Sequence, residues 1–205
     1  MSSLLMSEFY NPKGDILKHG ANLPHWQQDE VIQFVTFRLA DSMPRTKLRQ
    51  WKEELTVWKT QHPEPWTYEI EQEYHRKFTW RLETWLDEGY RACLFNDPAK
   101  REFLDQILTH DPEKKAIHHI WVIMPNHIHL LFTPLAPLEK LMQSWKGISA
   151  RRIGGGSIWQ KNYRDTLIRD ASHFANAVRY IRRNPAKLRK GTFTLWESER
   201  ALAIR

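Results

Sequence analysis

The sequence is poor in cysteine and has no long apolar run. Cys93 is the one cysteine among 205 residues, so no disulfide forms within the chain and the fold must depend on a hydrophobic core. No stretch approaches the ~20 apolar residues of a membrane span, and residues 1–15 lack the basic and then apolar pattern of a secretory signal. We therefore expect a cytoplasmic protein without a membrane partner.

Acidic residues are scarce in the C-terminal third. From Lys146 to Lys190 there are twelve Lys and Arg but two acids, Asp165 and Asp170, in a chain of net charge +7. This segregation favours a polyanionic partner such as a nucleic acid. An ordinary solvated basic face has the same composition, so the chemistry nearby must decide between the two interpretations.

Hydrophobic patterning predicts strands and helices in irregular alternation. Strands are expected at 31–39, 117–124 and 127–133, the last two joined as a β-hairpin through Pro125-Asn126. Helices are expected from Asp97, over 138–152, and from near Asp170 to just before Pro185.

This order of elements favours an α+β fold with helices packed mainly on one face of the sheet. Aromatic residues at helical spacing predict two more helices between residues 46 and 89. We expect a single domain over residues 1–205, with 46–89 as an inserted helical hairpin and 185–205 as a C-terminal tail.

His127 and His129 lie inside an otherwise apolar strand. Side chains alternate along a strand, so both imidazoles point to one face while Ile128 and Leu130 point to the other. Their Cα atoms should be ~6.5 to 7 Å apart, which lets both rings bind one metal ion. Two half-exposed strand histidines without a ligand would give the same pattern.

The last helix offers a second set of polar groups. At about 100° per residue, Phe174, Val178 and Ile181 form its core stripe. Tyr180 and Asn184, four residues apart, fall on a neighbouring stripe and can present a phenol and an amide to one point. A hydroxyl nucleophile and a metal-binding amide in a basic segment suit phosphoryl chemistry on a polyanion.

The histidine pair and its surroundings resemble a known family. His127-Ile128-His129 has the motif of the HUH single-strand endonucleases. The longer stretches MPNHIHLLFTP, IWQKNYRD and VRYIRRNPAK resemble the IS200-like transposases, specifically the REP-associated tyrosine transposases, and NLPHW and FVTFRLADSMP are similar to one branch of that group. The resemblance runs from about Leu23 to Lys190. The helical stretch 46–89 is absent from the smallest members, so nothing is transferred to it.

This resemblance implies a ferredoxin-like (RRM-like) antiparallel sheet in a Y1-transposase-like catalytic domain. By motif, Tyr180 is the nucleophile, and His127, His129 and Asn184 bind Mg²⁺ or Mn²⁺, although the ligand chemistry also permits Zn²⁺. Tyr163 is the rival tyrosine, but it precedes the helix and lacks a ligand partner on the same face. The implied activity is metal-dependent cleavage and joining of single-stranded, REP-type hairpin DNA through a 5′-phosphotyrosine.

Basic residues near these motifs are the expected phosphate contacts. They are Lys146, Arg151, Arg152, Arg179, Arg182, Arg183 and Lys187. The expected partner is single-stranded or hairpin DNA, and a monomer is favoured over a dimer. Two alternatives stay open: a non-catalytic RRM-like binder of structured nucleic acid, and a metal-dependent phosphodiesterase with water as the nucleophile.

Overall fold

The computed structural model describes residues 8–19, 25–63, 65–87, 93–110, 114–154 and 156–205. It forms two compact units, Met1–Leu39 with Leu94–Arg205 and, between them in sequence, Ala40–Cys93. The stretch 46–89 lies inside the second, smaller unit. In the described ranges no helix is both long enough and apolar enough to cross a membrane.

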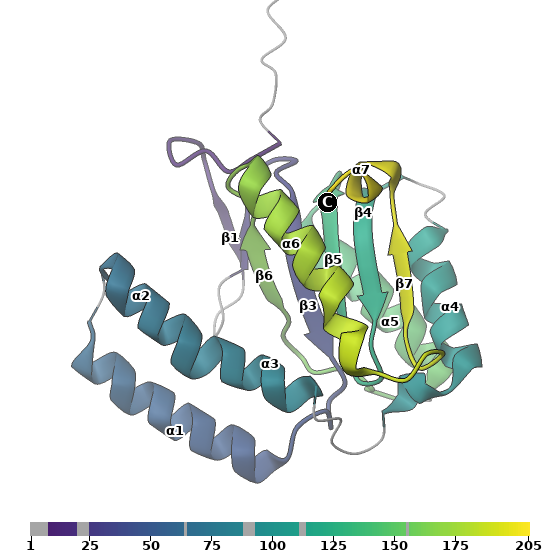
Figure 1. Ribbon diagram of the computed structural model, residues 1–205, viewed down its shortest axis with the longest axis horizontal. Coiled ribbons are helices and arrows are strands. Elements are labelled where there is room, and N and C mark those ends of the chain that lie inside the picture. Colours follow the sequence, from purple (N-terminus) through teal and green to yellow (C-terminus); the bar gives the residue numbers. More distant parts are fainter. Residues whose placement is uncertain (1–7, 20–24, 64, 88–92, 111–113, 155) are drawn as a thin grey trace, which may run out of the picture. The chain divides into compact units, whose positions relative to one another are not determined.

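The larger unit is built on a five-stranded antiparallel sheet of order β6-β3-β5-β4-β7 (Figure 1). Its strands are β3 (Gln33–Arg38), β4 (Ala116–Ile123), β5 (His127–Pro134), β6 (Arg164–Leu167) and β7 (Thr194–Glu197). A separate ladder pairs β1 (Leu17–His19) with β2 (His25–Gln27).

Two helices connect the strands in the ferredoxin-like manner. Helix α4 (Pro98–Thr109), preceded by the 3₁₀ turn η2 (Leu94–Asn96), comes before β4, and α5 (Leu138–Ile153) links β5 to β6. With these crossovers, the strand order β6-β3-β5-β4 is the fourth, first, third and second strand of a βαββαβ unit. The expected fold class is therefore confirmed.

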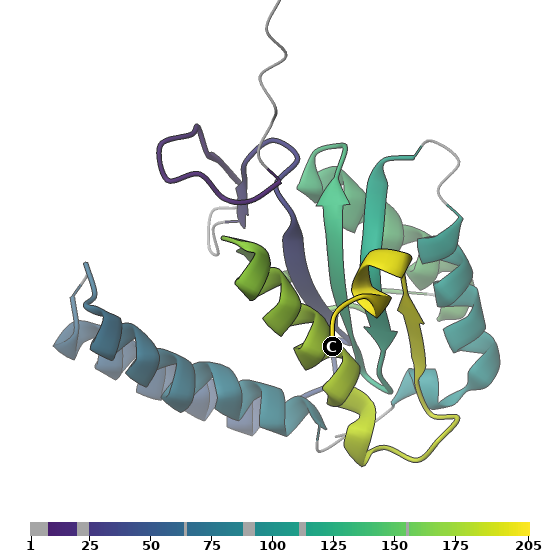
Figure 2. The same ribbon diagram turned by 45° about the horizontal axis from the view of Figure 1, so that its top comes forward.

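A different hydrophobic core lies on each face of the sheet. Val35 of β3 and Leu130 of β5 belong to the core that includes residues of α4 and α5. Leu131 of β5 belongs to the other core, with Phe174 and Val178 of helix α6 (Ala171–Arg183). Figure 1 and, from a second angle, Figure 2 show α6 lying across the sheet.

The expected placement of helices on one face is thus incomplete. It describes α4 and α5, whereas α6 packs on the opposite face. The reason is that the sheet is apolar on both faces, so the α6 stripe of Phe174, Val178 and Ile181 finds a second surface to cover.

Residues 185–205 are part of the fold rather than a tail. The 3₁₀ turn η3 (Asn184–Lys187) leads to β7, which pairs with β4, and then to α7 (Glu199–Leu202), whose first turn is capped by Ser198. Ala201 is buried in the core beneath α6. These elements are four residues long each, too short to give a recognisable hydrophobic period.

The smaller unit is helical. It consists of α1 (Arg45–Gln61), α2 (Tyr68–Tyr74), the π-helical turn η1 (His75–Thr79) and α3 (Trp80–Asp87). The Trp58 ring packs 5.6 Å from Phe78 and 5.7 Å from Tyr74, measured between ring centroids. A strict i+4 repeat is longer than the 3.6-residue turn, and the wider π turn keeps such residues on one packing face.

Candidate active site

Two imidazoles on the middle strand form the centre of the site. Strand β5 lies between β3 and β4, and His127 and His129 are buried there on the face that α6 covers. Their Nε2 atoms are 3.0 Å apart. The rings thus converge on one point.

Each imidazole is oriented through its Nδ1 atom. His127 Nδ1 lies 2.7 Å from Asn126 Oδ1, and because an amide oxygen only accepts, Nδ1 donates and Nε2 keeps its lone pair. His129 Nδ1 lies 2.8 Å from the Thr36 hydroxyl. Burial and, secondarily, the charge of Arg164 lower the pKa of His129 to about 3. Neutral rings held by such outer partners are in the form that binds metals.

Helix α6 brings Tyr180 and Asn184 to these rings. The helix begins at Asp170, whose side chain accepts from the backbone N–H of His173 at 2.7 Å. The Tyr180 ring lies edge-on to that of His129, with 5.3 Å between the centroids, and is 38% exposed. Asn184 Nδ2 lies 3.2 Å from His129 Nε2. Four of the residues indicated by the sequence therefore meet in one place.

The donor set fits a divalent cation. Two ligands at right angles, each about 2.1 Å from a metal ion, are about 3.0 Å apart, which matches the separation of the two Nε2 atoms. Asn184 Oδ1 is buried without a hydrogen-bond partner among the described residues. A half-turn of the amide exchanges its oxygen and nitrogen and places the oxygen beside His129.

Among the residues that the structure describes, no larger acidic or thiolate cluster competes with this arrangement. In the part of the chain that the structure describes, no group of three or more His, Cys, Asp or Glu side chains could hold a metal ion. Two imidazoles and an amide oxygen suit Mn²⁺ and leave coordination positions open for a substrate.

The rival tyrosine lies elsewhere. Tyr163 packs against the core that includes α4 and α5, and its ring stacks on His25 with 3.8 Å between the centroids. Burial raises the pKa of Tyr163, which makes its phenol a poorer nucleophile at neutral pH. The tyrosine next to the imidazoles is Tyr180.

The expected phosphate contacts on α5 are not gathered at the imidazoles. Lys146 Nζ donates to the backbone oxygens of Gln160 at 2.6 Å and Lys161 at 2.9 Å, and burial lowers its pKa to about 8. Arg151 and Arg152 are exposed, but their helix covers the opposite face of the sheet. Lys146 thus ties α5 to the chain entering β6.

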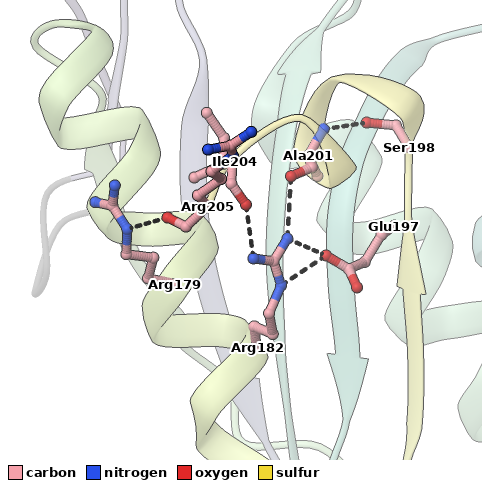
Figure 3. Close-up of polar contacts among 7 residues, drawn as sticks. All are labelled: Arg179, Arg182, Glu197, Ser198, Ala201, Ile204 and Arg205. Atoms are coloured by element: carbon pink, nitrogen blue, oxygen red, sulfur yellow. Dashed lines mark hydrogen bonds and ion pairs between the residues drawn. The ribbon is translucent and has the colours of Figure 1, made fainter.

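Arg182 of α6 is committed to protein atoms. Its Nε and Nη2 lie 3.0 and 2.6 Å from Glu197 Oε1. Figure 3 shows its remaining bonds, from Nη1 to the backbone oxygen of Ile204 at 2.8 Å and from Nη2 to that of Ala201 at 3.0 Å. This arginine fastens α6 to the segment that follows β7.

Among the other basic residues near α6, Arg179 resembles Arg182 in its contacts. Its Nε donates to the backbone oxygen of Arg205 at 2.7 Å (Figure 3). Its Nη1 donates to Asn176 Oδ1 at 3.1 Å. Arg183 and Lys187 have exposed side chains. Of the expected contacts, these two present charge to solvent at the end of the helix that carries Tyr180.

Sequence patterns did not indicate three residues that surround the imidazoles. Thr36 and Arg164 come from strands distant in the sequence, and only the register of β3 against β5 and β6 reveals their position. Asn126 directly precedes His127 in the hairpin turn. An amide directly beside a candidate metal ligand is the local sequence signal that could have indicated a residue orienting the imidazole.

Residues 85–184 match the family model described as "Transposase IS200 like". These residues form an IS200-like transposase domain. The range of this transposase domain contains the imidazole pair, Tyr180 and Asn184. Solved structures similar to the chain include a REP-associated tyrosine transposase bound to a REP hairpin, with a TM-score of 0.43 and 14% identity, covering 82% of this chain and 74% of that one. Comparison with curated proteins gives no match.

Proposed function

We propose that the protein is a metal-dependent single-stranded DNA endonuclease and strand transferase that acts through a 5′-phosphotyrosine at Tyr180. The observation that carries this proposal is the edge-on contact of the Tyr180 ring with His129, 5.3 Å between centroids. Tyr180 comes from α6 and His129 from β5, yet their side chains meet beside Asn184. The phenol is partly exposed, so a substrate can approach it.

His127, His129 and Asn184 would hold Mg²⁺ or Mn²⁺. A bound cation would polarise a non-bridging oxygen of the scissile phosphate and offset its charge. The sheet holds both imidazoles in place through Asn126 and Thr36, so the ligands need little rearrangement.

Tyr180 supplies the nucleophile. Its phenolic oxygen loses a proton and attacks phosphorus, so that a new P–O bond forms while the bond from phosphorus to the 3′ oxygen breaks. The leaving oxygen takes up a proton and becomes a free 3′-hydroxyl. Because the phosphotyrosine remains a phosphodiester, another 3′-hydroxyl can displace Tyr180 and join two strands without ATP.

The proposed substrate is a REP-type DNA hairpin with a single-stranded flank. The motif resemblance points to this class, and in-line attack needs the accessible backbone of a single strand. Exposed Arg183 and Lys187 supply positive charge near the nucleophile. Since α6 packs on the sheet of its own chain, one chain completes the site, which supports a monomer.

Trapping the covalent intermediate tests the proposal. Labelled hairpin DNA is incubated with the protein and Mn²⁺, denatured, and examined for DNA attached to protein. Wild type and Tyr163→Phe should form the adduct, while Tyr180→Phe and His129→Ala should not. Absence of an adduct from wild type would identify a non-catalytic binder, and strand cleavage that survives Tyr180→Phe would identify a hydrolase.

A further inference from the structure

An arginine from the sheet lies on the same face as the imidazole pair. In the antiparallel register, Arg164 of β6 is opposite Thr36 of β3, and Thr36 is opposite His129 of β5. Directly opposed residues project to the same face of a sheet. The contact between Thr36 Oγ1 and His129 Nδ1 shows which face this is, so Arg164 shares it.

The arginine is within reach of the imidazoles. Neighbouring strands are about 4.8 Å apart, so the Arg164 and His129 backbones are separated by two such spacings, about 10 Å. An arginine side chain is long enough to extend over Thr36 into the space beside the ring.

The neighbouring carboxylate is directed away. Asp165 follows Arg164 on β6 and therefore projects to the opposite face, where its Oδ1 lies 2.5 Å from His25 Nδ1 and its Oδ2 accepts from the Trp26 backbone N–H at 3.1 Å. Strand β6 thus presents a positive charge to the imidazole face and holds its negative charge on the other.

We propose that Arg164 is a phosphate-binding residue of this site and holds a DNA phosphate that lies over Thr36, next to the imidazole pair. This inference rests on the proposed function, because it needs single-stranded DNA to cross this face. A guanidinium suits the role since it offers paired N–H donors to two phosphate oxygens.

A charge-deletion scan of the DNA tests the assignment. Each phosphate around the cleavage position is replaced in turn by an uncharged methylphosphonate, and hairpin affinity is measured by fluorescence anisotropy with Tyr180→Phe protein. We expect Arg164→Gln to weaken binding of the unmodified hairpin by about tenfold. At one position, the methylphosphonate should weaken hairpin binding by the parent protein. The same replacement should not weaken binding by the Arg164→Gln protein any further.

Two variants separate this contact from general effects. Arg169→Gln removes a positive charge from an exposed residue just beyond β6. Its affinity should still fall when the methylphosphonate is placed at the selective DNA position. Arg164→Lys keeps the charge and should regain part of the sensitivity, which a misfolded site would not. The proposal would be overturned if the affinity losses from Arg164→Gln and from the methylphosphonate were additive at every DNA position. It would also be overturned if Arg164→Gln bound the unmodified hairpin as tightly as the parent protein.

The failures of the two proposals are distinguishable. The scan uses protein without the nucleophile, so it reports on Arg164 whether or not wild type forms a phosphotyrosine. A selective, non-additive position together with no covalent adduct would leave the phosphate contact standing and reject cleavage. No measurable binding of the hairpin by the parent protein would reject both.

Discussion

Arg182 and Glu197 join the helix that carries Tyr180 to the edge strand of the sheet, with Nη2 2.6 Å from Oε1. Strand β7, which contains Glu197, pairs with β4, and β4 pairs with β5. A continuous series of bonds therefore runs from α6 to the strand of the imidazoles. This contact links the two elements that carry the candidate site, in addition to the packing of α6 on the sheet.

Loss of this contact should loosen α6. We expect Glu197→Gln to lower the free energy of unfolding by about 1–2 kcal/mol, because a partly buried guanidinium loses its charged partner. Urea unfolding measures the change. Arg183→Gln removes a charge from an exposed position of the same helix and should change stability by less than about 0.5 kcal/mol. Equal losses of stability in the two variants would show that the Arg182–Glu197 contact contributes no more than an exposed charge.

The Thr36 hydroxyl should matter for metal affinity. Thr36→Val removes the group that orients His129 through Nδ1, so Mn²⁺ binding should weaken about 10- to 100-fold. Isothermal titration calorimetry gives the dissociation constants. Thr166→Val, on the neighbouring strand opposite Phe34, is the matched control and should bind Mn²⁺ like wild type. Unchanged affinity in Thr36→Val would argue against an imidazole-bound cation.

Stability should fall in mild acid because of His119. Burial, with the charge of Arg200 in second place, lowers the pKa of His119 to about 4 in the folded protein, against 6.5 ordinarily. Well above pH 6.5 the ring is neutral in both states, and its titration does not affect stability. As the pH falls from 6.5 to 4, the unfolded chain takes up a proton that the folded protein resists, which costs up to about 3 kcal/mol.

Comparing pH profiles of unfolding isolates this contribution. His119→Gln should lose less stability than wild type between pH 7 and 4, whereas His110→Gln, at an exposed position, should follow wild type. Chemical denaturation at several pH values provides the curves. Parallel curves for wild type and His119→Gln would contradict the assignment.

Substitutions of Arg183 and Lys146 should differ in their effect on the salt dependence of DNA binding. Arg183→Gln should reduce the slope of log affinity against log salt by about 0.7, as expected when one contact to a single strand is lost. Lys146→Gln should leave that slope unchanged, because its ammonium group binds backbone oxygens of Gln160 and Lys161. DNA titrations over a series of salt concentrations test both. A reduced slope in Lys146→Gln would show that Lys146 does contact a DNA phosphate.

Local sequence patterns were sufficient for much of the fold. The β-hairpin around Pro125-Asn126 and the start of α6 at Asp170 depend on turn and capping chemistry between near neighbours, and both occur in the structure. The i, i+4 spacing of Tyr180 and Asn184 likewise placed both on the side of α6 that meets His129.

Features that depend on pairing between distant segments were not predictable. The position of Arg164 beside the imidazoles follows from the β3–β6 register, which no local pattern encodes. Likewise, two partners of Arg182, Glu197 and Ala201, come from a strand and a short helix of four residues each, and nothing in the composition shows that its donors are already used. Charge alone could not separate arginines that bind protein from those that face solvent.

The imidazoles lie on the middle strand, which is paired with a strand on each side, whereas Tyr180 lies on a partly exposed surface of α6. Under the proposed function, one substitution of the phenol would abolish strand cutting and leave the sheet and the exposed basic residues of α6 in place. A protein that binds DNA without cutting it would then differ from the proposed enzyme at a single side chain.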